Sequence, residues 1–174
     1  MNYLEKAKKL YGGKKILILG LGLNQGGVGA AKFFASAGSQ VKITDLKNTQ
    51  LLQNSLDELQ EFREITYTLG EHKKEDIDWA EIIFRNPAVK PNNEFLKYAL
   101  EKNKPVIMDL HIFFEFISPK QLIAVTGTKG KSTTASLIYE VLKDNIDVVL
   151  AGNIGKSMLS LLPSIDSKTL IILE

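Results

Sequence analysis

The chain has 174 residues, of which 44% are hydrophobic and 24% charged, a balance typical of a globular protein that buries a core. Lysine and arginine exceed aspartate and glutamate by only two and are scattered along the chain, so nucleic acid is not an expected partner. The absence of cysteine excludes a disulfide framework, a thiolate metal site and a cysteine nucleophile, and it fits a cytoplasmic protein. The N-terminal residues do not form a signal peptide, and no apolar run is long enough to cross a bilayer, so no membrane association is expected.

The two histidines, His72 and His111, lie far apart and match no zinc-binding spacing. We therefore expect each to have an ordinary structural or surface role.

Strand-like and helix-like segments alternate along the chain, which predicts an α/β fold with a parallel sheet covered by helices. In the first part the expected strands are 15–19, 40–45, 65–69, 81–84 and 105–109, and the expected helices are 28–37, 49–62, 93–103 and 110–116. The last of these helices is apolar on nearly every side and is expected to pack between layers.

A polar, proline-containing break at residues 118–121 divides the chain into two units. It predicts a Rossmann-like domain over residues 1–117 and the incomplete first part of a second α/β domain over 118–174. The expected elements of the second unit are strands at 122–126, 147–150 and 170–173 and a helix at 132–143.

The segment 125–133, Val-Thr-Gly-Thr-Lys-Gly-Lys-Ser-Thr, lies between an apolar strand and a helix, as a phosphate-binding loop does. In such a loop backbone N–H groups converge on phosphate oxygens, a lysine adds charge and a hydroxyl reaches magnesium. Val125 stands where the strict pattern needs its first glycine, so the loop is shortened; an ordinary glycine-rich turn is the structural alternative. The residues expected to bind ATP are Gly127, Thr128, Lys129, Gly130, Lys131, Ser132 and Thr133.

A second glycine-rich loop, Gly-Leu-Gly-Leu-Asn-Gln-Gly-Gly at 20–27, also follows a strand and precedes a helix, where backbone amides can approach a pyrophosphate. It departs from the dinucleotide-binding pattern because Gln25 occupies a glycine position. Asp45, about twenty residues further on, nevertheless keeps an NAD-dependent oxidoreductase open as an alternative. A turn that merely needs positive φ is the structural alternative.

The segment 126–134 resembles the short phosphate loop of the Mur ligases and folylpolyglutamate synthetases, although most relatives carry asparagine where this chain has Lys129. Gly-Asn-Ile-Gly at 152–155 and Leu-Ile-Ile-Leu-Glu at 170–174 are similar to Mur ligase segments in the same order. The resemblance implies an ATP-dependent ligase of peptidoglycan precursor synthesis. It implies catalytic roles for Lys131, Glu174 and Asn153, and binding of Mg²⁺ by Ser132 and Glu174.

The first part resembles the Rossmann-like domain of the D-glutamate-adding Mur ligases, although Ala88 replaces a family glycine. The resemblance implies small-molecule substrates, namely UDP-N-acetylmuramoyl-L-alanine, ATP and D-glutamate, joined through an acyl phosphate. The implied contacts to the UDP-substrate are Gly22, Leu23, Asn24, Gln25, Gly26, Asp45, Lys47, Asn86, Pro87 and Asn153. The family's downstream histidine, modified lysine and C-terminal domain lie outside these 174 residues, so we expect a monomer that binds substrate without ligating it. A non-catalytic UDP-sugar-binding module is the other alternative.

Overall fold

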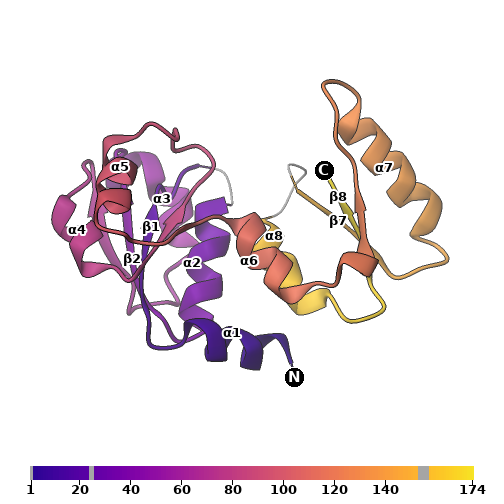
Figure 1. Cartoon of the computed structure of the whole chain (residues 1–174), viewed down its shortest axis with the longest axis horizontal. Coiled ribbons are helices and arrows are strands. Elements are labelled where there is room, and N and C mark those ends of the chain that lie inside the picture. Colours follow the sequence, from indigo (N-terminus) through magenta and orange to yellow (C-terminus); the bar gives the residue numbers. More distant parts are fainter. Residues whose placement is uncertain (1, 24–25, 153–156) are drawn as a thin grey trace.

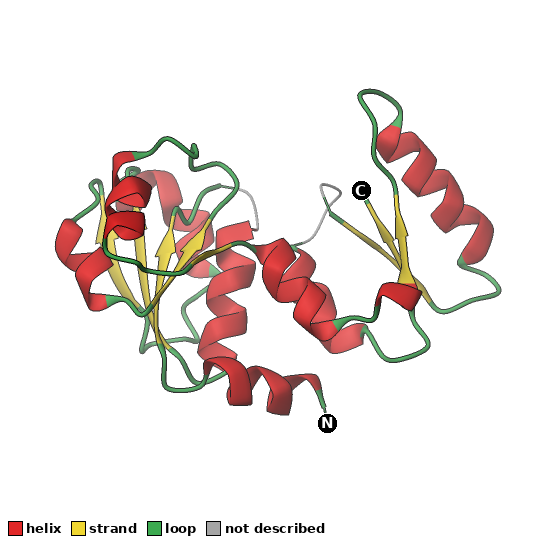
Figure 2. Cartoon of the chain, viewed as in Figure 1, coloured by secondary structure: helices red, strands yellow, loops and turns green. Residues whose placement is uncertain are grey.

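The computed structural model describes residues 2–23, 26–152 and 157–174, which form a mixed α/β structure with two parallel sheets (Figures 1 and 2). The helices are α1 (Tyr3–Tyr11), α2 (Gly26–Ser36), α3 (Thr49–Asp57), α4 (Lys74–Trp79), α5 (Glu94–Glu101), α6 (Asp109–Phe116), α7 (Lys131–Leu142) and α8 (Met158–Leu161), with 3-10 turns η1 (Pro119–Gln121) and η2 (Leu162–Ser164). The strands are β1 (Lys15–Leu19), β2 (Gln40–Asp45), β3 (Thr66–Leu69), β4 (Ile82–Arg85), β5 (Val106–Ile107), β6 (Leu122–Ala124), β7 (Val148–Ala151) and β8 (Leu170–Leu173).

The first sheet has the strand order β3-β2-β1-β4-β5, and its strands pair in parallel. β1 alternates between two cores, since Ile16 and Ile18 pack on the face covered by α1 and α2, whereas Leu17 and Leu19 pack against α4 and α5. The sheet is therefore covered on both faces, as the continuous apolar run of its central strand β1 predicts. Strand order reverses between β1 and β4, the position where α/β sheets bind ligands beyond their carboxyl ends.

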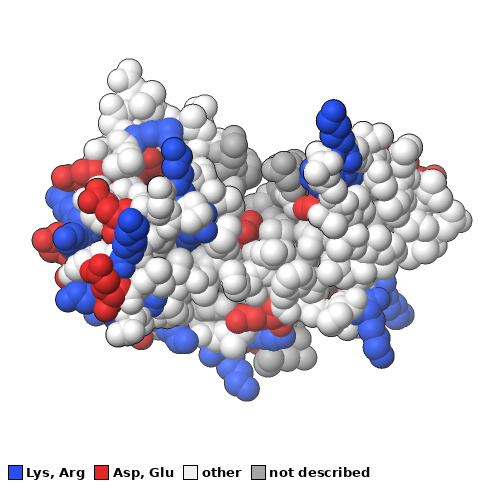
Figure 3. All heavy atoms as spheres, turned by 45° about the horizontal axis from the view of Figure 1, so that its top comes forward, with Lys and Arg blue, Asp and Glu red and all other residues white. Residues whose placement is uncertain are grey.

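The second sheet has the order β6-β8-β7, so its middle strand is the last one along the chain. Helix α7 covers this sheet by contacts to β7 and β8, but Ala135 is its only buried residue in the described part. Leu137 and Val141, one helical turn apart, are 61% and 73% exposed. The surface over α7 therefore carries apolar side chains and, on the face shown in Figure 3, few charged ones.

The two sheets are joined through α8, which packs against α2 and α6 (Figure 1). One continuous apolar core includes Phe34 of α2, Phe113 of α6, Leu159 of α8 and Ile171 of β8. The predicted boundary after residue 117 falls between α6 and η1, and it stays a prediction.

Several elements differ from the sequence expectation. The N-terminal helix α1 was not anticipated, and it begins at an Asn2 and Glu5 capping box. Helices α4 and α8 have six and four residues, too few for a helical period to stand out. The expected helix 49–62 ends at Asp57, and Phe114 of α6 is 47% exposed instead of packing between layers. In the part of the chain that the structure describes, every helix is too short or too polar to traverse a bilayer.

Candidate functional site

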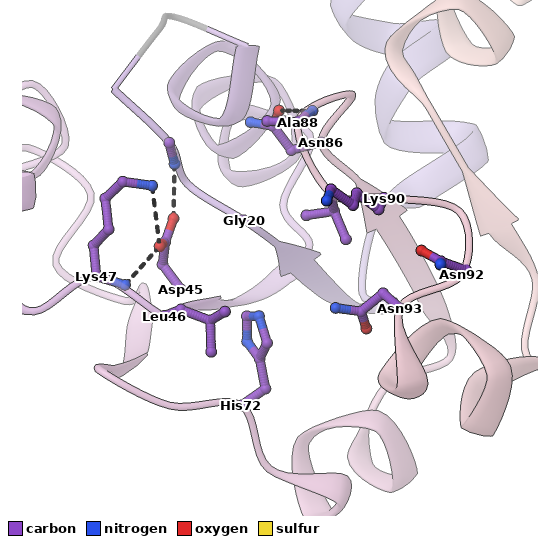
Figure 4. Close-up of a pocket in the computed structure, with 12 residues that line it drawn as sticks. Gly20, Asp45, Leu46, Lys47, His72, Asn86, Ala88, Lys90, Asn92 and Asn93 are labelled. Atoms are coloured by element: carbon purple, nitrogen blue, oxygen red, sulfur yellow. Dashed lines mark hydrogen bonds and ion pairs between the residues drawn. The ribbon is translucent and has the colours of Figure 1, made fainter.

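A cavity of about 310 Å³ lies at the carboxyl ends of β1, β2 and β4, at the reversal of strand order (Figure 4). Its size is at the lower end of the range for small-molecule sites. The lining residues are Gly20, Gly22, Asp45, Leu46, Lys47, His72, Asn86, Ala88, Val89, Lys90, Asn92 and Asn93.

Asp45, the last residue of β2, is buried and ties two loops together. Its Oδ2 accepts the N–H of Gly22 at 2.9 Å, and its Oδ1 accepts the N–H of Lys47 at 2.8 Å (Figure 4). The Lys47 ammonium lies 4.0 Å from Oδ1 and keeps 43% of its side chain exposed. Asp45 thus shapes the glycine loop, while Lys47 and Lys90 supply positive charge to the cavity wall, which favours an anionic ligand.

The glycine loop needs glycine for steric reasons at two positions. Gly20 has φ of 89°, and a β-carbon there would lie 2.9 Å from Val89 Cγ2 and 3.2 Å from Asn86 Cβ. A β-carbon on Gly27 would lie 2.2 Å from the carbonyl oxygen of Leu21. These contacts bring the β1 loop close to α2 and to the turn after β4.

Asn86 is buried at the end of β4 and shapes the turn that follows. Its Nδ2 donates to the Leu21 carbonyl at 3.4 Å, and its Oδ1 accepts the N–H of Ala88 at 3.0 Å. Ala88 takes the position at which the resemblance to the Mur ligases implies a glycine. Among described non-glycine residues only Asn103 has a positive φ, so Ala88 adopts its turn without that strain.

The predicted UDP-substrate residues therefore divide into three groups. Gly22, Asp45, Lys47 and Asn86 line the cavity. Leu23, Gly26 and Pro87 do not line it: Leu23 is 64% exposed, Gly26 begins α2 and Pro87 is exposed. Asn24, Gln25 and Asn153 lie outside the described residues.

Several residues of the cavity wall were not among the predicted site residues, including Leu46, His72, Lys90, Asn92 and Asn93. They come from loops after β2, β3 and β4, which only the parallel sheet brings to one edge. Leu46 directly follows β2, which was an available signal for that residue, whereas the others lie further along their loops and local sequence offered no such signal for them. His72, for which an ordinary structural or surface role was expected, faces the cavity with its ring (Figure 4).

The second predicted loop connects β6 to α7 and is open to solvent. Thr128, Lys129 and Gly130 are exposed, and Gly130 is the N-cap of α7 with φ of 77°. No side chain among the described residues caps α7, so N–H groups of its first turn are available to an anion. Lys131 begins the helix beside Gly127, with its Cγ 3.9 Å from where a Gly127 β-carbon would lie.

Ser132 and Glu174 meet next to this loop, because β8 lies beside β6 in the sheet. The Ser132 hydroxyl donates to Glu174 Oε1 at 2.8 Å, while Oε2 is buried without a hydrogen-bond partner among the described residues. A β-carbon on Gly152 would lie 2.4 Å from the Glu174 carbonyl oxygen, so this glycine permits the close approach of β7 to the end of β8. A hydroxyl and an unsatisfied carboxylate oxygen are ligands that a hard cation prefers.

The fold and its two glycine loops define an α/β protein built from a Rossmann-like sheet and a strand, glycine loop and helix unit. The family described as "Mur ligase MurD-like, N-terminal domain" matches residues 14–108, more than half of the chain. The chain belongs to this family.

Relatives and a solved structure agree with this assignment. The chain is 46% identical over 160 residues to UDP-N-acetylmuramoylalanine–D-glutamate ligase of Borreliella burgdorferi (strain ZS7), covering 91% of this chain and 34% of the relative. It is 42% identical over 163 residues to the ligase of the same name from Roseiflexus sp. (strain RS-1), covering 93% and 34%. It thus spans about a third of the length of these relatives.

A structure of UDP-N-acetylmuramate:L-alanyl-gamma-D-glutamyl-meso-diaminopimelate ligase from Neisseria meningitides is similar in fold. It is 19% identical, covers 93% of this chain and 52% of its own, and has a TM-score of 0.55.

Proposed function

We propose that this chain forms the substrate-binding domain and the first part of the ATP-binding domain of a ligase that joins D-glutamate to UDP-N-acetylmuramoyl-L-alanine. Its similarity to relatives with that activity supports the reaction class. The cavity beyond β1, β2 and β4 would hold the UDP-substrate, and the loop at Gly127–Thr133 would hold the triphosphate of ATP. The division into domains at residues 117 and 118 is part of this proposal.

The observation that carries the proposal is the pairing of Ser132 with Glu174 beside an uncapped helix that begins at Lys131. The buried, unpaired Glu174 Oε2 fits a cation ligand, because an unsatisfied buried carboxylate oxygen is costly unless a partner neutralises it. Ser132 and Glu174 would hold Mg²⁺, which when bound neutralises charge on the phosphates of ATP. Lys131 and the first amides of α7 would orient the γ-phosphoryl group.

Catalytic roles for Lys131, Glu174 and Asn153 belong to the same proposal. Phosphoryl transfer depends on position and charge neutralisation, so the chain needs no side-chain nucleophile. We expect no ligation by the 174-residue chain alone, because the family's remaining catalytic parts lie in the length that this chain does not span.

Isothermal titration calorimetry of the 174-residue chain with UDP-N-acetylmuramoyl-L-alanine and with ATP plus Mg²⁺ tests the proposal. We expect saturable binding of the UDP-substrate and magnesium-dependent binding of ATP. Binding of the UDP-substrate without ATP would favour the non-catalytic module, and tight NAD binding without UDP-substrate binding would favour an oxidoreductase. Amide formation with D-glutamate by the isolated chain would contradict the expected inactivity.

A further inference from the structure

His72 is held in the cavity wall by two contacts from different elements. Its Nδ1 lies 2.7 Å from the hydroxyl of Thr44 on β2, and its ring packs edge to face on Phe95 of α5, with centroids 5.1 Å apart. The ring is half-buried and points into the cavity (Figure 4). Its orientation is therefore set before any ligand binds.

Thr44 also determines which ring nitrogen of His72 carries the proton. The buried Thr44 hydroxyl donates to the carbonyl oxygen of Glu71 at 3.0 Å, and a hydroxyl has only one proton to donate. Toward His72 it must then accept, so Nδ1 carries the proton. In the neutral ring Nε2 is unprotonated, and it is a hydrogen-bond acceptor with no partner among the described residues.

The position of His72 relative to the glycine loop indicates which part of a nucleotide it would meet. The cavity extends from the β1 loop at Gly22, past Asp45 at the end of β2, to His72 after β3. Neighbouring strands lie about 4.8 Å apart, so the two ends are separated by roughly 10 Å, which is the span of a nucleoside. A diphosphate at the glycine loop and helix α2 therefore places the base beside His72.

The walls near His72 suit a flat ring. Leu46 lines the cavity and is 64% exposed, and Val89 forms another part of the wall. Covering Leu46 with a pyrimidine ring removes apolar surface from water, which favours binding. Asn92 and Asn93 also line the cavity, and their amides can each donate or accept, whereas the neutral His72 ring offers an acceptor in a fixed direction. Polar groups placed in this way within a partly apolar wall select bases by their hydrogen-bond donors.

We propose that His72 is a specificity-determining residue whose unprotonated Nε2 accepts the imide N–H of uracil and thereby disfavours cytosine. Uracil carries a proton on N3, whereas the N3 of cytosine is itself an acceptor, so cytosine would set two acceptors against each other. This inference rests on the proposed binding of a UDP-substrate in the cavity and names the group that recognises its base.

Protonation of His72 would reverse this preference, because Nε2 then becomes a donor. Burial lowers the pKa of His72 below its usual value, against the opposing influence of nearby carboxylates. The ring is thus neutral near pH 7.5, and its acceptor is lost as the pH falls through that lowered pKa. The charged groups around the ring are Asp45, Lys47, Glu71, Lys73, Asp76, Lys90 and Glu94.

The test is calorimetric titration of the 174-residue chain with UDP and with CDP at pH 7.5 and at lower pH. We expect UDP to bind about tenfold or more tightly than CDP, since one hydrogen bond contributes ~1.5 kcal/mol and the mismatch adds to it. The ratio of the affinity for UDP to that for CDP should fall toward one as the pH drops below the lowered pKa of His72. Both nucleotides carry the same diphosphate, so its own titration cancels in that ratio.

Two variants separate recognition from packing. His72→Phe keeps a ring against Phe95 but has no acceptor, so the UDP to CDP ratio should fall to about one. His72→Gln offers an amide oxygen as acceptor and should retain part of the preference. His111→Phe, at the only other histidine, is the matched control and should leave the ratio unchanged.

Three outcomes would overturn the inference. If wild type binds UDP and CDP equally, or if His72→Phe binds both normally with the ratio intact, His72 does not select the base and the proposed function still stands. If wild type binds neither UDP nor the full UDP-substrate, the proposed function fails and this inference fails with it.

Discussion

Gly29 of α2 lies so close to Ser157, the residue before α8, that a β-carbon on Gly29 would be 2.4 Å from Ser157 Cβ and 2.3 Å from its Oγ. This contact joins the first sheet's layer of helices to the second sheet, because α8 packs on α2 and α6. Real β-carbons do not approach other atoms so closely, so only glycine fits here without a shift of α8.

Gly29→Ala should therefore loosen the junction between the two sheets. We expect the free energy of unfolding to fall by up to about 2 kcal/mol, because an overpacking cost of ~1–3 kcal/mol is offset by a gain of ~1 kcal/mol in helix propensity. Urea denaturation followed by circular dichroism measures the change. Adding Ser157→Gly to Gly29→Ala removes the clashing atoms and should restore part of the lost free energy of unfolding. If the changes caused by the two substitutions simply add, the clash between Gly29 and Ser157 is not the cause.

Lys131→Ala should weaken the binding of ATP in the presence of Mg²⁺ by about ten- to hundredfold, since a hydrogen bond to a charged group contributes ~1.5–3 kcal/mol. Calorimetry or displacement of a fluorescent nucleotide provides the measurement. Lys143→Ala is the matched control, because Lys143 follows the other end of α7 and pairs with Glu140 at 2.5 Å. Unchanged affinity for Lys131→Ala would remove the basis for assigning the loop to ATP.

Lys42→Met should destabilise the first sheet and the helices that cover it by leaving Asp76 buried without its cation. Lys42 Nζ lies 2.9 Å from Asp76 Oδ1, and their side chains are 23% and 6% exposed. We expect the free energy of unfolding to fall by about 3 kcal/mol. This is the lower end of the range for removing one partner of a buried ion pair, because Lys42 keeps some contact with water. Chemical denaturation of Lys42→Met and of Lys42→Met with Asp76→Asn tests this. The double variant should recover much of the free energy of unfolding that Lys42→Met loses. If the single and double variants are equally stable, the buried charge of Asp76 is not the cause of the loss.

Asp109→Asn should change stability in a pH-dependent way. Burial raises the pKa of Asp109 at the start of α6, against the opposing effect of backbone N–H groups. Because the folded-state pKa lies above the unfolded one, the carboxyl group favours folding at pH values below both, and this contribution is lost as the pH rises through the folded pKa. The variant should thus have a higher Tm than wild type at pH 7 and the same Tm at pH 3. A Tm difference independent of pH would point to packing instead.

Much of the first sheet was predictable, because β1 is a short apolar run followed by glycine, and β2 alternates apolar and polar residues and ends in an acidic one. The run Lys15–Leu19 and the following small-residue helix appear in the structure nearly as expected. The α/β class and the family resemblance were both confirmed. Elements that depend on tertiary contacts were missed: α1 is stabilised by Tyr11 packing on Phe33 and Phe34, and no local period reveals this.

The candidate site was only partly predictable for a related reason. Asp45 ends β2 and Gly22 lies in the loop that follows β1, so local sequence placed them at the ligand edge. His72 and Asn93 reach the same cavity through separate loops, and only the order of the strands brings them there. The spacing of residues along the chain does not show that the loops of His72 and Asn93 lie next to each other. The roles of the predicted ATP-binding residues stay a prediction.

The strand order β6-β8-β7 has a consequence for how the protein is made. Among the residues that the structure describes, β6 and β7 pair only with β8, so within this chain neither has a strand neighbour until residues 170–173 leave the ribosome. The five strands of the first sheet are complete some sixty residues earlier, after β5 ends at Ile107. Nascent chains should therefore form their first sheet during translation. The predicted phosphate-binding loop at 125–130 should become ordered later, when β8 inserts between β6 and β7.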